Sequence, residues 1–306
     1  MNDLLIAVRS HLQNNAVRVP APATAWSVQG GRVEVVLDGE RLGENIQRSG
    51  PSIPSYVFAL AFWHEQATGK RLDGVVRVVG DVPDTVAGNR ARFMLTELAA
   101  ALGDRLRVVG LVPWSLPARP VMNAPMAARE ASLHAGSREH QVEVLLTQQA
   151  TNPMGRLQRQ FPLGLFNECK STKTRLFPGG GAQADLWSFD EETRTLHLVE
   201  LKVGGNATVG IIPEAFTYAL LLRRFATHPG ASWSVEWEGS RAARRAEQIV
   251  VWLAAEKFHP LVFSEGRSPL AWLNTGLAET GVEFRIVPID VDGTRAVRWG
   301  TTWPHP

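Results

Sequence analysis

Apolar residues recur with strand and helix spacing along the first 115 residues. Segment 32–38 (RVEVVLD) alternates polar and apolar residues, as a strand with one buried face does. Segments 75–79 and 106–112 are also strand-like, and the spacing predicts helices over 4–12, 56–67 and 89–102. A strand, a helix and a second strand in this order indicate a parallel crossover unit. We therefore expect an N-terminal α/β accessory domain over residues 1–115.

The next segment changes in character. Residues 113–136 contain four prolines and show little periodicity, which favours a connection over an element of a core. We expect a linker over 116–136 and a second α/β domain over 137–306.

The pattern sharpens again at Ser137, a good N-cap for a helix that extends to about residue 149. Residues 150–181 are irregular and basic. The later apolar segments then predict a hairpin of strands 184–189 and 196–203, a helix over 213–225, a strand over 248–254, a helix over 269–280 and a strand over 282–289.

Composition narrows the class of protein. The chain has 306 residues, of which 44% are hydrophobic, so it is long enough for two modest domains with real cores. Its 32 basic and 30 acidic residues nearly cancel, which excludes a general polycation. The single cysteine, Cys169, excludes a disulfide scaffold and a cysteine-rich zinc site. With no long apolar run and no signal-peptide pattern, we expect a cytoplasmic protein that has no membrane partner.

Two acids and a lysine stand out on the predicted hairpin. Alternate strand residues share a face, so Glu200 and Lys202 project side by side, about 6–7 Å apart, while Leu201 points to the opposite, buried face. If the chain turns near Asp190, Asp185 on the partner strand comes close to them. Two carboxylates then converge beside one ammonium group.

This set of groups has a chemical meaning. Two hard oxygen ligands suit Mg²⁺ (or Mn²⁺), which keeps several waters and also binds substrate phosphate. Asp185, Glu200 and the backbone carbonyl of Leu201 are the expected ligands. The ion would lower the pKa of a bound water, while Lys202 would orient that water or neutralise the attacked phosphate.

The spacing of Asp185 from Glu200-Leu201-Lys202 resembles the PD-(D/E)xK nuclease superfamily, and most closely its resolvase-like and mismatch-endonuclease-like branches. The resemblance covers residues 137–289. It implies a restriction-endonuclease-like αβββαβ core, with the first acid on the second strand and the (D/E)xK motif on the third. It also implies metal-dependent hydrolysis of DNA, by an endonuclease rather than an exonuclease, and a homodimer.

The surroundings match the same branches in part. Their glutamate-bearing helix corresponds to Glu139, an assisting catalytic residue, and their Gly-rich segment corresponds to residues 179–181. Two positions depart from the pattern: Ala184 replaces the proline before the first acid, and Glu214 replaces a glutamine on the following helix. The departure at Glu214 makes the contribution of that helix an open question.

Other residues are weaker candidates. Glu139 borders the apolar face of its helix and Glu143 lies farther round, so either acid could face the site, with Glu139 better aimed. Residues 119–181 include eight basic and four acidic side chains, and this excess of positive charge favours contact with a polyanion. The expected substrate contacts are Gln183, Arg156, Arg159, Lys173 and Arg175. A second basic group consists of Arg241, Arg244 and Arg245.

Three alternatives stay open, and the first is an exposed strand on which Glu200 and Lys202 form an ordinary i, i+2 ion pair. The chain has a second acid-x-Lys tripeptide, Glu168-Cys169-Lys170, with no aspartate in the preceding twenty residues, so the tripeptide by itself is not diagnostic. The same fold could serve as a non-catalytic module that binds nucleic acid or protein. An unrelated α/β enzyme acting on a small molecule is the third reading. His197 lies out of phase with Glu200 and is expected to face away from the carboxylates.

Overall fold

The chain divides into two compact units of mixed α/β structure, which is the fold class expected from the sequence. The computed structural model describes residues 1–20, 25–43, 49–125, 137–149, 152–177, 182–204, 208–292 and 296–304. Unit 1 consists of Met1–Ser115, Thr208–Thr217 and His259–Gly276, and unit 2 of Leu116–Ala207, Tyr218–Phe258 and Leu277–Pro306. Each unit is thus assembled from three stretches of chain. Residues 126–136 of the expected linker and residues 178–181, which include the Gly-rich segment, lie outside the described residues.

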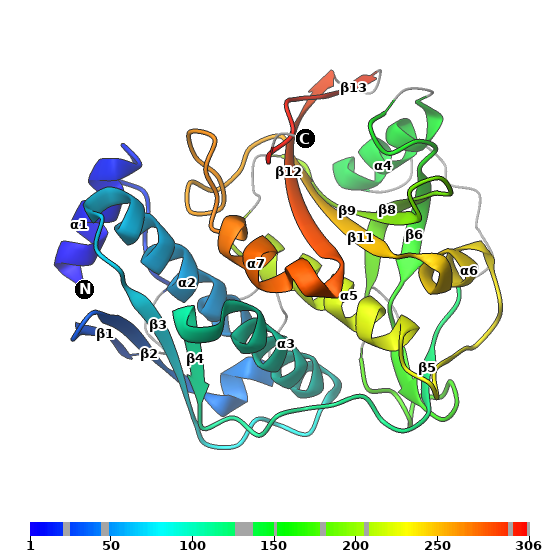
Figure 1. Cartoon of the computed structure of the whole chain (residues 1–306), viewed down its shortest axis with the longest axis horizontal. Coiled ribbons are helices and arrows are strands. Elements are labelled where there is room, and N and C mark those ends of the chain that lie inside the picture. The colour runs from blue at the N-terminus through cyan, green and yellow to red at the C-terminus, as the bar shows by residue number, and fades with distance from the viewer. Residues whose placement is uncertain are drawn as a thin grey trace. The chain divides into compact units, whose positions relative to one another are not determined.

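Unit 1 is built on a four-stranded sheet with the order β1-β2-β3-β4 (Figure 1). Its strands are β1 (Ala25–Gln29), β2 (Arg32–Asp38), β3 (Asp73–Val79) and β4 (Leu106–Val109). Strand β1 is antiparallel to β2, and β2, β3 and β4 are mutually parallel neighbours. Its helices are α1 (Asn2–His11), α2 (Ser49–Thr68), α3 (Val86–Leu102), η1 (Gly39–Gly43) and η2 (Gly103–Arg105). The predicted parallel crossover is confirmed.

Alternating burial explains why the first of the parallel strands forms. Val33, Val35 and Leu37 are fully buried, and they alternate with more exposed residues along β2. The turn into α3 needs Gly88, since a Cβ there would lie 1.9 Å from the carbonyl oxygen of Pro83. Together these features fix the sheet and the start of the helix that follows β3.

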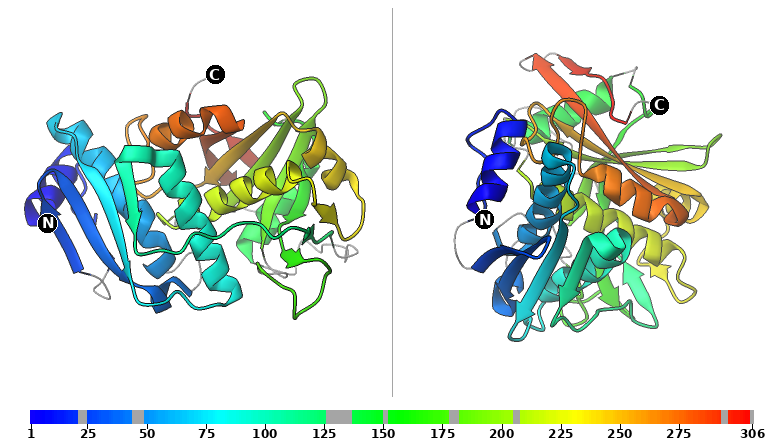
Figure 2. Two further views of the ribbon diagram at one scale, coloured as in Figure 1. Left: turned by 60° about the horizontal axis from the view of Figure 1, so that its bottom comes forward. Right: turned by 60° about the vertical axis from the view of Figure 1, so that its left-hand side comes forward.

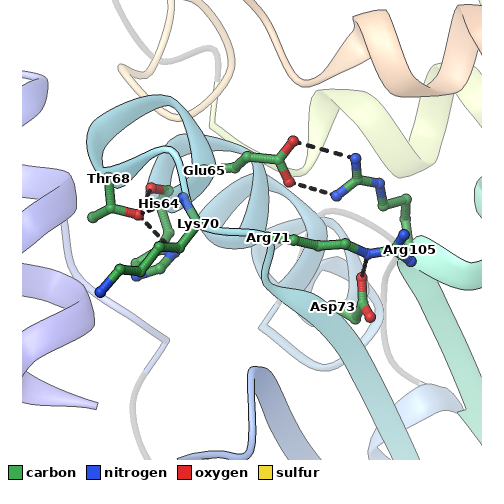
Figure 3. A network of polar contacts seen from close by, with 7 residues as sticks. All are labelled: His64, Glu65, Thr68, Lys70, Arg71, Asp73 and Arg105. Carbon is green, nitrogen blue, oxygen red and sulfur yellow. Dashed lines mark hydrogen bonds and ion pairs between the residues drawn. The ribbon is translucent and has the colours of Figure 1, made fainter.

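A polar network closes the C-terminal end of α2 within unit 1 (Figure 3). The guanidinium group of Arg105 donates to both carboxylate oxygens of Glu65, at 2.5 and 3.2 Å, and stacks 4.5 Å from the ring centroid of Trp272. A second pair, Arg71 and Asp73, lies nearby at 2.8 Å and has a more exposed arginine. The partly buried bidentate pair is the one expected to matter for stability.

Replacing Glu65 with alanine is expected to destabilise unit 1 by about 1–2 kcal/mol, because Arg105 then loses both oxygen partners. The urea midpoint of the full chain measures this effect. Arg71→Gln is the matched control, and it should leave the midpoint unchanged since its ion pair is exposed to solvent. Equal shifts in the two variants would contradict the assignment.

Unit 2 contains a six-stranded sheet with the order β13-β12-β11-β9-β8-β6, which Figure 2 shows from two sides. Its strands are β6 (Gln158–Pro162), β8 (Gln183–Asp190), β9 (Thr195–Lys202), β11 (Gln248–Ala255), β12 (Val282–Asp292) and β13 (Ala296–Trp299). Strands β6, β8 and β9 form an antiparallel meander, and β11 is parallel to both β9 and β12. Strand β13 is antiparallel to β12.

Smaller elements complete unit 2. A three-stranded sheet has the order β10-β5-β7, with β10 (Ser232–Trp233), β5 (Pro120–Met122) and β7 (Leu165–Asn167). Its helices are α4 (Arg138–Gln148), α6 (Glu238–Arg245) and η3 (Ala278–Thr280). Two further helices, α5 (Ile211–Ala226) and α7 (Leu270–Leu277), contain residues of both units.

One hydrophobic core joins α4 to the six-stranded sheet. Val142, Leu145 and Leu146 of α4 share a buried cluster with Leu186 of β8 and with apolar residues of β9, β11 and β12. Ser137 caps the helix as predicted, and its hydroxyl accepts the backbone N–H of His140 at 3.3 Å. The core therefore holds the acidic first turn of α4 close to the β8–β9 hairpin.

Several short elements differ from the prediction. Strands β6 and β7 fall in the segment read as irregular, where Gln160 adopts a positive φ of 59° and interrupts the alternation. Strand β5 begins with Pro120 and helix α6 has few apolar residues, so neither gives a clear periodic signal. Among the helices of the described residues, none has the length and apolar character needed to cross a membrane.

Candidate active site

The predicted hairpin is present and brings Asp185 to the motif strand. Its turn is held by Asp190, whose carboxylate accepts the backbone N–H groups of two turn residues. Strands β8 and β9 remain paired as far as Leu186 and Val199. One residue beyond this pair, Oδ2 of Asp185 accepts the backbone N–H of Leu201 at 2.7 Å. Asp185 is thus fixed beside the centre of the Glu200-Leu201-Lys202 motif.

Lys202 lies between two carboxylates. Its Nζ donates to Oε1 of Glu200 at 2.5 Å and lies 4.0 Å from Oε1 of Glu139, on the first turn of α4. Glu200 is almost fully buried, with 4% of its side chain exposed, whereas 34% of Glu139 is exposed. Leu201, which stands between Glu200 and Lys202 in the sequence, belongs to the hydrophobic core, as its predicted orientation required. The structure therefore brings Asp185, Glu200, Lys202 and Glu139 together.

The surroundings of Asp185 disfavour its negative charge. Although the residue keeps some exposed surface, loss of solvation around the carboxyl group raises its pKa to about 8. The positive charge of Lys202 and the hydrogen bond from Leu201 act in the opposite direction, while Glu143 and Glu139 raise the pKa further. The site thus contains more acidic groups than its own cations balance.

The two acids of α4 have different partners. Glu143 is buried, and its Oε2 accepts from Nη2 and Nε of Arg159 at 2.8 and 3.0 Å. Arg159 also contacts Nδ1 of His140 at 2.8 Å. Burial raises the pKa of Glu143. Glu143 is more deeply placed than the helical spacing indicated, because Arg159 on β6 reaches it and compensates its charge. Of the two acids, Glu139 is the one near Lys202.

The expected substrate contacts do not all lie together. Arg156 and Arg159 line one cavity, which is described below, and Gln183 is the first residue of β8, paired with Pro162. Lys173 and Arg175 are exposed on the segment after β7, and within the described part of the chain they form no ion pair with the site residues. Lys170 of the second acid-x-Lys tripeptide is exposed in a bend, outside any strand.

Glu256 is a site residue that the sequence interpretation missed. It follows the last residue of β11, and its carboxylate accepts the backbone N–H of Gly204 at 2.5 Å and Nη2 of Arg138 at 2.7 Å. It therefore ties the segment after Lys202 to the start of the helix that carries Glu139. The order of the elements could have indicated Glu256, because β9 and β11 are parallel and their carboxyl ends meet at one edge of the sheet.

Glu214 on α5, at the position where the resemblance expected a glutamine, is buried together with Tyr218 one helical turn later. Neither residue is therefore a solvated residue of the helix surface.

His197 faces the core, away from the carboxylates, as its position in the strand predicts. Trp252 donates from Nε1 to Nδ1 of His197 at 3.1 Å. Loss of solvation, followed by the charge of Arg285, lowers the pKa of His197 to about 4. The ring is therefore neutral in the folded protein at neutral pH.

This depressed pKa predicts a loss of stability in mild acid. Between the ordinary histidine pKa of about 6.5 and the folded value, the unfolded chain takes up a proton that the folded protein does not. As pH falls through this window, stability should drop by roughly 2 kcal/mol. Thermal unfolding across the window, compared with a His197→Gln variant that lacks this proton uptake, measures the effect. Identical pH profiles would contradict it.

The donor set fits a hard divalent cation. Asp185 and Glu200 offer carboxylate oxygens, and Leu201, whose N–H contacts Asp185, offers a backbone carbonyl. Among the residues that the structure describes, no group of three or more His, Cys, Asp or Glu side chains forms a ready-made metal site. An ion would therefore depend on these two carboxylates, a backbone carbonyl and water or substrate oxygens.

Comparisons of the chain with protein families, with curated proteins and with solved structures find no match.

Proposed function

We propose that unit 2 is a metal-dependent nuclease that hydrolyses DNA phosphodiester bonds, and that α4, β6, β8, β9, the part of α5 that belongs to unit 2 (residues 218–226) and β11 form a restriction-endonuclease-like core. The order of these elements and the parallel pairing of β11 with β9 support the second part of the proposal. DNA is the proposed substrate and Mg²⁺ (or Mn²⁺) the proposed cofactor.

The observation that carries the proposal is the hydrogen bond from the Leu201 N–H to Asp185. This contact supports an arrangement in which the first acid meets the centre of the Glu200-Leu201-Lys202 motif, at the end of the hairpin where β8 and β9 cease to pair. A fold serving only as a scaffold gains nothing from two poorly solvated acids at one spot, since burying a charge is costly.

Asp185, Glu200 and the carbonyl of Leu201 would hold the cation, which when bound supplies a water of lowered pKa and charge for the phosphate. Lys202 would position the attacking water and donate a hydrogen bond to the phosphate as its negative charge grows. Glu139, on the far side of the ammonium group from Glu200, would keep Nζ pointing into the site. Glu256 would maintain the spacing of α4 and β9.

The direct test is incubation of the full chain with supercoiled plasmid, linear duplex, single-stranded, branched and RNA substrates. We expect cleavage of DNA with Mg²⁺ or Mn²⁺ and none in EDTA. Cleavage of closed circular plasmid identifies an endonuclease, as proposed. Tight binding without cleavage under every metal condition would favour the non-catalytic binding module instead.

Cutting both strands of a duplex at one place calls for two such sites, so we propose that the active form is a homodimer. Light scattering after size-exclusion chromatography, with and without DNA, measures its mass. A monomer that makes double-strand breaks without prior nicking would overturn this part of the proposal.

A further inference from the structure

A polar cavity of about 790 Å³ lies in unit 2, beside the edge strand β6. Its walls come from the C-terminal part of α4, residues 156–159, the end of the β8–β9 hairpin and helix α6. The charged lining residues are Arg156, Arg159, Glu191, Glu238, Arg241 and Arg245. Nothing in the proposed chemistry uses this cavity.

The charges around the cavity favour an anion. Four arginines and two glutamates line the cavity. Both glutamates accept hydrogen bonds, Glu191 from Arg245 at 2.9 Å and Glu238 from Gln158 at 2.8 Å. Within the described residues, exposed Arg156 and Arg241 form no ion pair of their own. Their guanidinium groups are therefore available, and an arginine fork matches two oxygens of a phosphate.

Arg159 links the cavity to the surroundings of Asp185. Arg159 lines it and is paired across the strands with Leu186, the neighbour of Asp185. The same guanidinium group holds Glu143, whose charge acts on Asp185. The cavity thus lies at the turn end of the hairpin, and Arg159 is its lining residue nearest to Asp185 in the sheet.

We infer that this cavity binds the phosphate backbone of a single nucleic-acid strand a few nucleotides away from the bond that is cut, through Arg156 and Arg241. The inference rests on the proposed function, because the strand is its substrate. A volume of this size holds roughly one or two nucleotides. It is too small for a double helix, whose major groove alone is about 12 Å wide. The substrate class it indicates is DNA with a frayed, flapped or otherwise unpaired strand.

The test is binding in EDTA, where no hydrolysis takes place, of a fluorescein-labelled oligothymidylate to the full chain. We expect the double variant Arg156→Gln/Arg241→Gln to bind at least about tenfold more weakly. The slope of affinity against salt concentration should fall by about 1.4, or about 0.7 for each lost phosphate contact. The matched control is Arg119→Gln/Arg298→Gln, which removes two exposed arginines of unit 2 that do not line the cavity. It should bind as the wild type does.

Competitors identify the occupant. An unlabelled single strand should displace the probe far better than a duplex, a deoxynucleoside monophosphate or a glutamate-rich peptide. Equal losses in the two double variants, or a monophosphate or acidic peptide that competes as well as the strand, would overturn the inference. If the cavity variant loses probe binding but the wild type does not cleave DNA, only the proposed nuclease activity is refuted. If the wild type cleaves DNA with metal but the cavity variant binds the probe unchanged, only the proposed role of the cavity is refuted.

Discussion

Lys202→Ala is expected to lower metal-dependent DNA cleavage by about 10²–10³-fold. The ammonium group lies 2.5 Å from Glu200 and 4.0 Å from Glu139, and it is the cation on the motif strand available to meet charge that develops on the phosphate. Its removal takes away an interaction that strengthens in the transition state, so the cleavage rate at saturating DNA should fall while DNA binding changes little.

The chain offers a matched control for this experiment. Lys170 stands in the same acid-x-Lys sequence context but is exposed in a bend, so Lys170→Ala should cleave normally. Because alanine at position 202 removes an ion-pair partner of nearly buried Glu200, Lys202→Arg serves as a second variant that keeps the charge. It should fold as the wild type does and still cleave slowly, since a planar guanidinium group cannot replace a compact ammonium. Normal cleavage by both Lys202 variants would refute the proposed role.

Asp185→Asn is expected to abolish metal-dependent cleavage and, in the absence of metal, to make the protein more stable than the wild type at alkaline pH. The folded-state pKa of Asp185 is raised to about 8, so between about pH 4 and 8 the folded protein retains a proton that the unfolded chain has lost. Wild-type stability should therefore fall as pH rises through this window. Asparagine carries no charge at any pH and escapes the loss, which amounts to several kcal/mol at about pH 9 for a pKa raised by about four units.

Urea unfolding in EDTA at about pH 5 and about pH 9 measures this difference. Asp190→Asn is the control, because hydrogen bonds from Thr193 lower the pKa of Asp190 and give the opposite dependence. The Asp190 variant should lose stability relative to the wild type above the ordinary aspartate pKa, not gain it. If Asp185→Asn fails to gain stability at high pH, the carboxyl is not the poorly solvated group that the site requires.

The elements predicted from sequence are those whose apolar spacing is long and regular. Strand β2, helix α3 and the β8–β9 hairpin were located to within a few residues, because each buries one continuous face. Helix α2 begins at Ser49, seven residues before the predicted start, because Pro51 and Pro54 obscured its first turns. Strands β5, β6 and β7 were not predicted, because a segment of three to five residues is too short to show a hydrophobic period.

In the candidate site too, the contacts that follow from local strand geometry were predicted and those that depend on tertiary packing were not. Strand geometry was sufficient to predict that Asp185 would approach Glu200 and Lys202, since hairpin register follows from the turn. The partners of Glu143 and Glu256 could not be predicted, because Arg159 and Gly204 reach them across gaps in sequence that only tertiary packing determines. Lys173 and Arg175 were chosen on local charge alone, which carries no information about direction.

The division of the chain has a practical consequence for anyone who wishes to study one part in isolation. A fragment starting at residue 116 would carry residues 208–217 and 259–276 without the unit to which they belong, leaving Val209, Ile212, Leu261 and Leu270 without their native neighbours. Such a fragment should be prone to aggregation. Excision at a single point thus yields no self-sufficient half, and the full-length polypeptide is the smallest material on which the experiments above should be performed.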